Sequence, residues 1–320
     1  MTADAIRAPA LKRAALHEVR SHIFDSARWA PYRPRPDDIV VATYPKCGTT
    51  WTQRIVEMLV TGSAEPAPIM VPWYDMRLHG PLEGMHQIAE AVTKRRQLKS
   101  HLPYDALPVF EGVKTIHVAR DGRDAAMSFH NHKLGYNSEA IARTNAVMTA
   151  DPKFGFEMAP VPEDPATFFS AWVDDGGADG DERCSYFYLE NSYWAARRDP
   201  DMLLVHYNDM KADRGGEIRR IAAFLGISHP EPVMAAIIEA AGFEQMHEAA
   251  DVLMPMAANA WEGGAKRFLY KGTNRRWEGA VSDADLARYD ARVRSDFSPA
   301  LAAWLEHGRL GSYDPASAPD

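Results

Sequence analysis

The sequence has few cysteines and no long apolar run, and both absences limit what the protein can be. Only Cys47 and Cys184 occur among the 320 residues, so a disulfide framework is excluded and a reducing compartment is expected. No apolar run reaches the roughly 18 residues of a membrane-spanning helix. Residues 1–20 carry scattered charges instead of the apolar centre of a signal peptide. We therefore predict a cytoplasmic protein without a transmembrane segment.

The sequence also lacks an excess of basic residues. Its formal net charge is −8, which argues against a nucleic-acid partner, although a local basic pocket can still bind an anion. Apolar residues make up 46% and charged residues 25% of the chain, as in ordinary globular proteins. Neither an internal repeat nor a low-complexity linker divides it. We predict one domain over residues 1–320.

Spacings typical of metal ligands are missing as well. The sequence contains no H-x-x-x-H, no C-x-x-C and no paired-carboxylate pattern that suggests a metal site. We therefore predict that no metal takes part in function.

Short apolar runs alternate with helical patterns along most of the chain. This alternation predicts an α/β fold in which helices flank a central parallel sheet. Residues 5–24 have helical spacing and predict an N-terminal helix or arm within residues 1–30. Two stretches without a clear period, 134–164 and 247–276, predict long active-site loops. The strands are expected at 38–42, 97–100, 114–119 and 202–207, and the helices at 52–60, 84–95, 121–133, 165–175, 185–198, 212–225 and 230–241.

The segment 43–51 is the most informative part of the chain. It carries Lys46 and Gly48 in a short turn between a buried strand and a helix. Free N–H groups at a helix start, the helix dipole and a nearby ammonium together bind phosphate. The segment is not a Walker A motif, because the lysine precedes the single glycine. An ordinary strand–helix turn with a surface lysine is the alternative.

Two further strand ends carry polar side chains. Lys99 and His101 follow one strand, at the sheet edge where ligands of open α/β folds bind. A histidine there can act as a general base, although a surface or capping histidine is the simpler reading of one residue. Arg120 ends another strand, and with Ser128 it could bind a second phosphate. A Gly-containing basic loop at 271–277, with Lys271, would by itself be read as a solvated turn.

A kinase of the P-loop type would hold magnesium with a strand-end aspartate. No predicted strand ends in aspartate; the three strands after the 43–51 segment end near His101, Arg120 and Tyr207. Lysines and arginines would instead neutralise the anionic ligand. The residues thus point to transfer of a charged group without metal.

The chain resembles the cytosolic-type sulfotransferases, which use 3'-phosphoadenosine 5'-phosphosulfate (PAPS). The family pattern Y-P-K-S-G-T-T-W matches residues 44–51, except that Cys47 replaces the serine. Four further family motifs follow in order at residues 99–103, 120–128, 203–211 and, in a degraded form, 268–277. The layout is also similar to bacterial members, including a glycolipid sulfotransferase. The resemblance implies the same fold with a P-loop-like phosphosulfate-binding loop.

The resemblance also assigns roles to individual residues. In catalysis, Lys46 would stabilise the leaving phosphate oxygen, Lys99 would contact the sulfuryl oxygens and His101 would take the acceptor's proton. The 5'-phosphate would be held by Cys47, Gly48, Thr49 and Thr50. The 3'-phosphate would be bound by Arg120, Ser128, Lys271 and Gly272. The adenine would be framed by Trp51, Tyr207 and Phe243.

Some positions depart from the family pattern. Cys47 lacks a hydroxyl that can contact the catalytic lysine in the family, which affects control of donor hydrolysis. Tyr270 stands in place of an arginine, which weakens the 3'-phosphate site unless Arg275 or Arg276 substitutes. Ala241 and Gly242 replace a Thr-Ser pair on the adenine side. The family's C-terminal dimer motif is not recognisable, so we predict no oligomeric state.

The acceptor is a small organic or lipid hydroxyl in this interpretation. Residues 72–76, including Trp73 and Tyr74, are expected to line an apolar pocket together with Phe129 and His130. Such a pocket suits a phenol, sterol, lipid or glycolipid. Two alternatives remain open: a nucleotide-dependent kinase and a non-catalytic nucleotide-binding relative.

Overall fold

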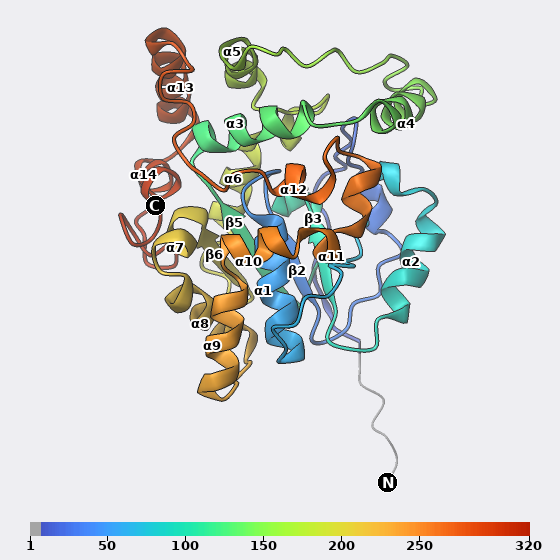
Figure 1. The fold of residues 1–320 in the computed structure, drawn as a ribbon, viewed down its shortest axis with the longest axis vertical. Coiled ribbons are helices and arrows are strands. Elements are labelled where there is room, and N and C mark those ends of the chain that lie inside the picture. The colour runs from blue at the N-terminus through green and yellow to red at the C-terminus, as the bar shows by residue number, and fades with distance from the viewer. Residues whose placement is uncertain (1–7) are drawn as a thin grey trace.

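The centre of the molecule is a sheet of four parallel strands in the order β3-β2-β5-β6, seen in the computed structural model, which describes residues 8–320 (Figure 1). The strands lie at the predicted apolar runs: β2 (Ile39–Ala42), β3 (Gln97–Ser100), β5 (Lys114–Ala119) and β6 (Met202–His206). The predicted α/β fold with a parallel sheet is therefore confirmed.

Side chains of the sheet alternate between two cores. Ile39 and Val41 of β2 belong to one apolar cluster, whereas Val40 and Ala42 belong to the other. Because successive residues of a strand point to opposite faces, a strand covered on both sides needs an unbroken apolar run. This is why the four apolar residues of β2 form a buried strand.

The first apolar cluster joins one face of the sheet to helices that begin and end close to their predicted bounds. It includes residues of α1 (Thr49–Thr61), α8 (Arg214–Leu225) and α9 (Glu231–Ala240). Along the chain, the short helix α7 (Tyr207–Ala212) follows β6 directly and precedes α8. The strand β6 therefore ends at His206, one residue before its predicted end at Tyr207.

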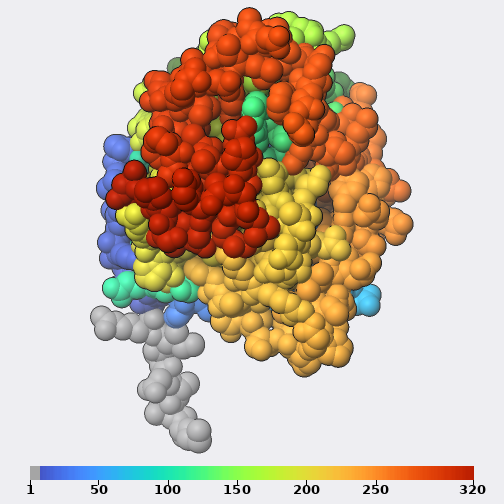
Figure 2. Space-filling view, turned by 90° about the vertical axis from the view of Figure 1, so that its left-hand side faces the viewer, coloured from blue at the N-terminus to red at the C-terminus, as the bar shows by residue number. Residues whose placement is uncertain are grey.

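The second cluster covers the other face with aromatic side chains. Its helices are α2 (Leu82–Ala91), α3 (Gly122–Lys133), α5 (Pro165–Asp175), α6 (Tyr186–Ala195), α13 (Asp283–Asp296) and α14 (Pro299–His307). The C-terminal residues, red in Figure 2, lie against the yellow and gold segments that follow β6, and His206 donates from Nε2 to the Leu305 carbonyl at 2.9 Å. No helix within residues 8–320 is both long and apolar enough to span a bilayer.

Of the two predicted alternatives for the N-terminal segment, a helix or an arm, residues 8–24 form no helix and have the form of an arm. That part of the chain is extended, and β1 (Leu11–Arg13) pairs antiparallel with β4 (Val109–Phe110); residues 5–7 lie outside the described residues. Val19 is fully buried, whereas Leu11 is 56% exposed. The spacing of apolar residues thus reflects separate contacts and not one helical face.

The two predicted long loops contain short helices. The first, 134–164, holds α4 (Ser138–Thr149). The second, 247–276, begins within the last turn of α10 (Phe243–Glu248) and holds α11 (Ala250–Leu253) and α12 (Gly264–Leu269). In Figure 1, α10, α11 and α12 pass in front of the upper ends of β2 and β3. Residues of α10 and α12 lie with Lys99, His101 and Arg120 around one cavity, so these two helices cover the edge at which the polar strand ends meet.

Candidate active site

A cavity of about 260 Å³ lies beside the carboxyl ends of β2, β3 and β5. Most of the predicted site residues line it, although they come from distant parts of the sequence. They are Lys46, Gly48, Thr49, Thr50, Trp51, Trp73, Lys99, His101, Arg120, Ser128, Phe129, Tyr207, Phe243 and Gly272. The structure thus brings the predicted motifs together at one place.

The 44–51 loop presents a helix N-terminus to this cavity. Gly48 is the N-cap of α1 and has φ 114°, and a Cβ there would lie 3.2 Å from the Tyr207 ring, so both the backbone and the space favour glycine. The first bond of the helix runs from the Thr52 N–H to the Gly48 carbonyl at 3.0 Å. The preceding N–H groups of Thr49 and Thr50 are therefore available to an anion.

His101 is held in a defined orientation. Its Nδ1 lies 2.7 Å from the Thr43 carbonyl, so Nδ1 carries the proton and Nε2 has the free lone pair. Thr43 Oγ1 also lies 2.6 Å from Thr49 Oγ1, at the start of α1. Burial, with Lys99 and Lys46 nearby, moves the pKa of His101 well below its ordinary value. The imidazole is thus neutral at neutral pH.

Lys99 lies against an aromatic ring. Its Nζ is 3.4 Å from the centroid of Trp73, whose Nε1 donates to Asp75 Oδ2 at 3.1 Å. Burial lowers the pKa of Lys99 to about 7, although the negative charge of Asp75 acts in the opposite direction. Asp75 itself is fully buried and also accepts a bond from the His101 backbone N–H at 3.0 Å. The Asp75 carboxylate therefore fixes the Trp73 ring and the His101 backbone from the buried side of the cavity wall.

Lys46 points into the same cavity from an uncommon backbone conformation. Its φ of 71° lies in the left-handed region, where residues with a Cβ are seldom found outside functional loops. Its Nζ lies 4.2 Å from the Phe268 ring centroid. The pKa of Lys46 is lowered to about 7 by burial and then by the positive charges of Lys99, Arg120 and Arg276.

Arg120 connects the end of β5 to the 270–277 loop. Its guanidinium lies 4.2 Å from the Tyr207 ring centroid and donates to the Thr273 carbonyl at 3.1 Å and to Asn274 Oδ1 at 2.7 Å. Its Nε is buried without a partner in the described structure. An unpaired buried donor on a cation is a favourable place for an anionic oxygen.

An aromatic slot lies beside these cations. Trp51 donates from Nε1 to the Ala241 carbonyl at 2.8 Å and meets the Tyr207 ring edge to face at 5.5 Å. Phe243 is 37% exposed, and a Cβ on Gly272 would lie 2.6 Å from its ring. The close approach of this backbone to Phe243 therefore needs glycine.

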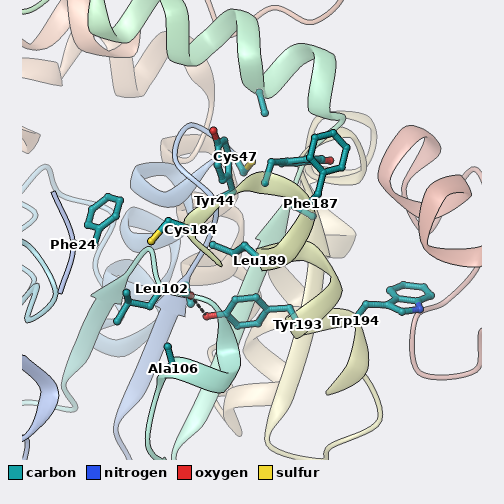
Figure 3. Packing of buried hydrophobic residues seen from close by; sticks show 14 of the residues in the cluster. Phe24, Tyr44, Cys47, Leu102, Ala106, Cys184, Phe187, Leu189, Tyr193 and Trp194 are labelled. Carbon is teal, nitrogen blue, oxygen red and sulfur yellow. Dashed lines mark hydrogen bonds between the residues drawn. The ribbon is translucent and has the colours of Figure 1, made fainter. Parts of the chain in front are cut away.

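Four predicted residues do not line the cavity. Cys47 points into the apolar core beside α6, as Figure 3 shows, and is fully buried. Tyr74 packs against Trp29 within the core. His130 donates from Nε2 to the Pro162 carbonyl at 2.7 Å, and Lys271 is exposed on the surface. The backbone N–H of Cys47, which was expected to hold the 5'-phosphate, donates to the Tyr44 carbonyl at 3.3 Å. Tyr74 and His130, which were expected to bind the acceptor, lie outside the cavity.

Of the two arginines that could substitute for the one replaced by Tyr270, Arg276 lines the cavity, and its guanidinium lies 5.1 Å from the Tyr270 ring centroid. The neighbouring Arg275 points outward and pairs with Glu278 at 2.7 Å. The cavity is also lined by residues to which the sequence assigned no role, including Asn131, His132, Tyr136, Asp179, Lys211, Trp261 and Phe268. His132 lies one helical turn after Ser128, so the spacing itself could have identified it.

Comparison with known proteins identifies a sulfotransferase domain over residues 36–301. A glycolipid sulfotransferase of Mycobacterium bovis is 30% identical in an alignment 320 positions long, gaps included. The alignment covers 93% of this chain and 96% of that protein. Sulfotransferase 1A1 of Rattus norvegicus is 28% identical over 269 residues, covering 80% and 83% of the two chains.

Solved structures have the same fold. A mouse sulfotransferase complexed with PAP superposes with a TM-score of 0.61 at 22% identity, covering 83% of this chain and 85% of that chain. Retinol dehydratase in complex with androsterone and PAP gives a TM-score of 0.59 at 21% identity, with 83% and 82% covered.

Proposed function

The chain belongs to the sulfotransferase domain family, and we propose that it moves the sulfuryl group of PAPS to a hydroxyl of a lipid or small organic acceptor. Membership confirms the family resemblance predicted from five motifs. Transfer of a sulfuryl group follows from the family; the donor, the acceptor class and the roles of the residues are the proposal.

One observation supports this proposal above the others. The cavity combines a helix N-terminus with a second, separate cationic position at Arg120 and Arg276. PAPS has two anionic groups, the 5'-phosphosulfate and the 3'-phosphate, and needs two such positions. The aromatic slot of Trp51, Tyr207 and Phe243 lies next to them and suits the adenine.

The proposed reaction is a single in-line displacement. The acceptor oxygen forms a bond to sulfur while the bond between sulfur and the bridging phosphate oxygen breaks, and the electron pair leaves with adenosine 3',5'-bisphosphate. His101 Nε2 takes the hydroxyl proton. Lys46 and the loop N–H groups stabilise charge on the leaving oxygen, and Lys99 stabilises the sulfuryl oxygens. Side-chain cations thus supply the positive charge, and we propose that no metal is needed.

The acceptor would bind on the aromatic side of the cavity. Phe24 and Trp73 each pack against the His101 ring, with centroids 5.4 Å and 5.1 Å away, and Phe129 and Trp261 also line this side. Apolar walls with one polar end suit an alcohol or phenol on a hydrophobic body. The mycobacterial relatives named as glycolipid sulfotransferases support a lipid acceptor.

The second anion position is tested by Arg120→Ala. We expect the variant to bind adenosine 3',5'-bisphosphate more weakly by about 1.5–3 kcal/mol, because a charge-assisted hydrogen bond is lost. Binding of adenosine 5'-phosphate should hardly change. Titration calorimetry with both nucleotides measures this difference, and an equal loss for both would refute the assignment of Arg120 to the 3'-phosphate.

Two neighbouring arginines offer a matched comparison in the same loop. Arg276 lines the cavity, whereas the side chain of Arg275 is 74% exposed. We expect Arg276→Ala to weaken bisphosphate binding by about 10-fold or more, the loss of one hydrogen bond to a charged group. Arg275→Ala should leave it within a factor of about two. Similar losses in both variants would mean that only long-range charge matters.

A further inference from the structure

Both ring nitrogens of His132 are engaged in the cavity wall. Its Nδ1 lies 3.3 Å from Lys46 Nζ, and its Nε2 lies 3.1 Å from the Tyr136 hydroxyl. The ring packs against Trp261 at 4.8 Å and Phe268 at 5.5 Å between centroids, and Trp261 Nε1 donates to the His132 carbonyl at 3.2 Å. The imidazole is therefore fixed in position and orientation.

The charge of Lys46 determines which nitrogen of His132 carries the proton. A protonated amine can only donate, so Nδ1 accepts and the Nε2–H donates to Tyr136. Burial and the positive charge of Lys46 move the pKa of His132 well below its ordinary value, which keeps the ring neutral and able to accept. His101 differs, because its Nε2 has no partner in the described part of the chain. His132 thus acts on Lys46, whereas His101 faces the acceptor.

Lys46 has little else to hold its amine. Its other close neighbour is the face of the Phe268 ring, and the buried Cys47 Sγ lies 4.0 Å from the Pro45 carbonyl. The groups with the largest effect on the pKa of Lys46 after burial are Lys99, Arg120, Arg276 and the Cys47 thiol, and His101 and His132 also lie near it. The carboxylate that lines the cavity, Asp179, is paired with Lys133 at 2.7 Å. A neutral acceptor is therefore the main stabilisation of the charged amine before a donor binds.

We propose that His132, oriented by Tyr136, is a positioning residue that holds the protonated amine of Lys46 in the cavity until the anionic donor takes its place. The inference rests on the proposed role of Lys46 in sulfuryl transfer. It predicts that loss of the Nδ1 acceptor makes Lys46 lose its proton at lower pH, because the charged form loses its hydrogen bond.

The test measures Lys46 in the donor-free protein. Acetic anhydride labels only the neutral amine, so the labelling of Lys46 as a function of pH, read by peptide mass spectrometry, reports its titration. In His132→Phe the midpoint should fall by about one pH unit, while the ring still packs against Trp261 and Phe268. In His132→Asn the amide oxygen stands close to the position of Nδ1 and should restore most of the shift. The labelling of the exposed Lys271 serves as the internal control.

Two further measurements separate this proposal from the proposed function. The alkaline limb of kcat/KM for PAPS should shift down with the labelling midpoint in His132→Phe and return in His132→Asn. Tyr136→Phe, which removes only the hydroxyl, should give a smaller shift in the same direction. An unchanged Lys46 midpoint in His132→Phe would overturn the positioning role. A shifted midpoint in a protein that transfers no sulfuryl group from PAPS would support that role and refute the proposed reaction.

Discussion

Replacing His101 by alanine is expected to lower kcat on an alcohol acceptor by about 10²–10⁴-fold, the usual contribution of a positioned general base. The bond from Nδ1 to the Thr43 carbonyl at 2.7 Å leaves Nε2 as the only ring atom that can accept the proton. Adenosine 3',5'-bisphosphate should bind with nearly normal affinity, because the imidazole borders the Phe24 and Trp73 side of the cavity and not the aromatic slot.

A second variant separates two roles of His101, proton acceptance by Nε2 and the hydrogen bond that Nδ1 donates to the Thr43 carbonyl. His101→Asn can still donate to the Thr43 carbonyl but has no atom in place of Nε2, so it should be nearly as inactive as the alanine variant. An acidic phenol as acceptor should lose less than an alcohol, since it needs less help in losing its proton. Near-normal turnover of an alcohol by both variants would remove His101 from the mechanism.

The sequence was sufficient to predict the sheet because its strands are buried on both faces. β2 is an unbroken apolar run and β5 is apolar apart from its first two residues and the buried His117, and both begin and end within one residue of the predicted bounds. The helices of the 134–164 and 247–276 segments were not predictable in the same way. In α4, for example, Ala140, Thr144 and Met148 are buried, and small or polar residues on the inner face give little periodic signal.

The parallel sheet also explains which site residues could be predicted. Strands that run in one direction end at one edge, so residues that follow β2, β3 and β5 had to meet there. Side chains of helices and loops were harder to place. On α3, His132 follows Ser128 by four residues and shares its face, whereas His130 follows by two and points to the Pro162 carbonyl. Helical geometry thus favours His132, although the predicted acceptor residue was His130.

Donor capture is expected to decline steeply above neutral pH. Burial lowers the pKa values of Lys46 and Lys99 to about 7. A lysine stabilises the donor only when it is protonated, so kcat/KM for PAPS is high below this pKa and falls as the pH rises through it. His101 is already neutral in this range, because its pKa is well below the ordinary value. The phosphate of the donor also completes its second ionisation near pH 6 and adds no limb.

The size of the decline tells how many lysines must carry a proton. Between pH 7 and pH 9, kcat/KM should fall roughly 50-fold if one protonated lysine is required and roughly 10³-fold if both are. Mutual repulsion couples the two amines, since Lys99 lowers the pKa of Lys46, so the titration belongs to the pair and the slope should lie between −1 and −2. In Lys99→Met only the titration of Lys46 should remain, so the slope should be −1, and its midpoint should lie at a higher pH because the repulsion from Lys99 is lost.

In contrast, kcat should stay nearly independent of pH, because the bound anionic donor raises the pKa of both lysines. The acceptor should be an alcohol that does not titrate in this range, so that its own ionisation adds no pH dependence. A kcat/KM that stays constant to pH 9 would show that the lysines are not the charges that capture the donor.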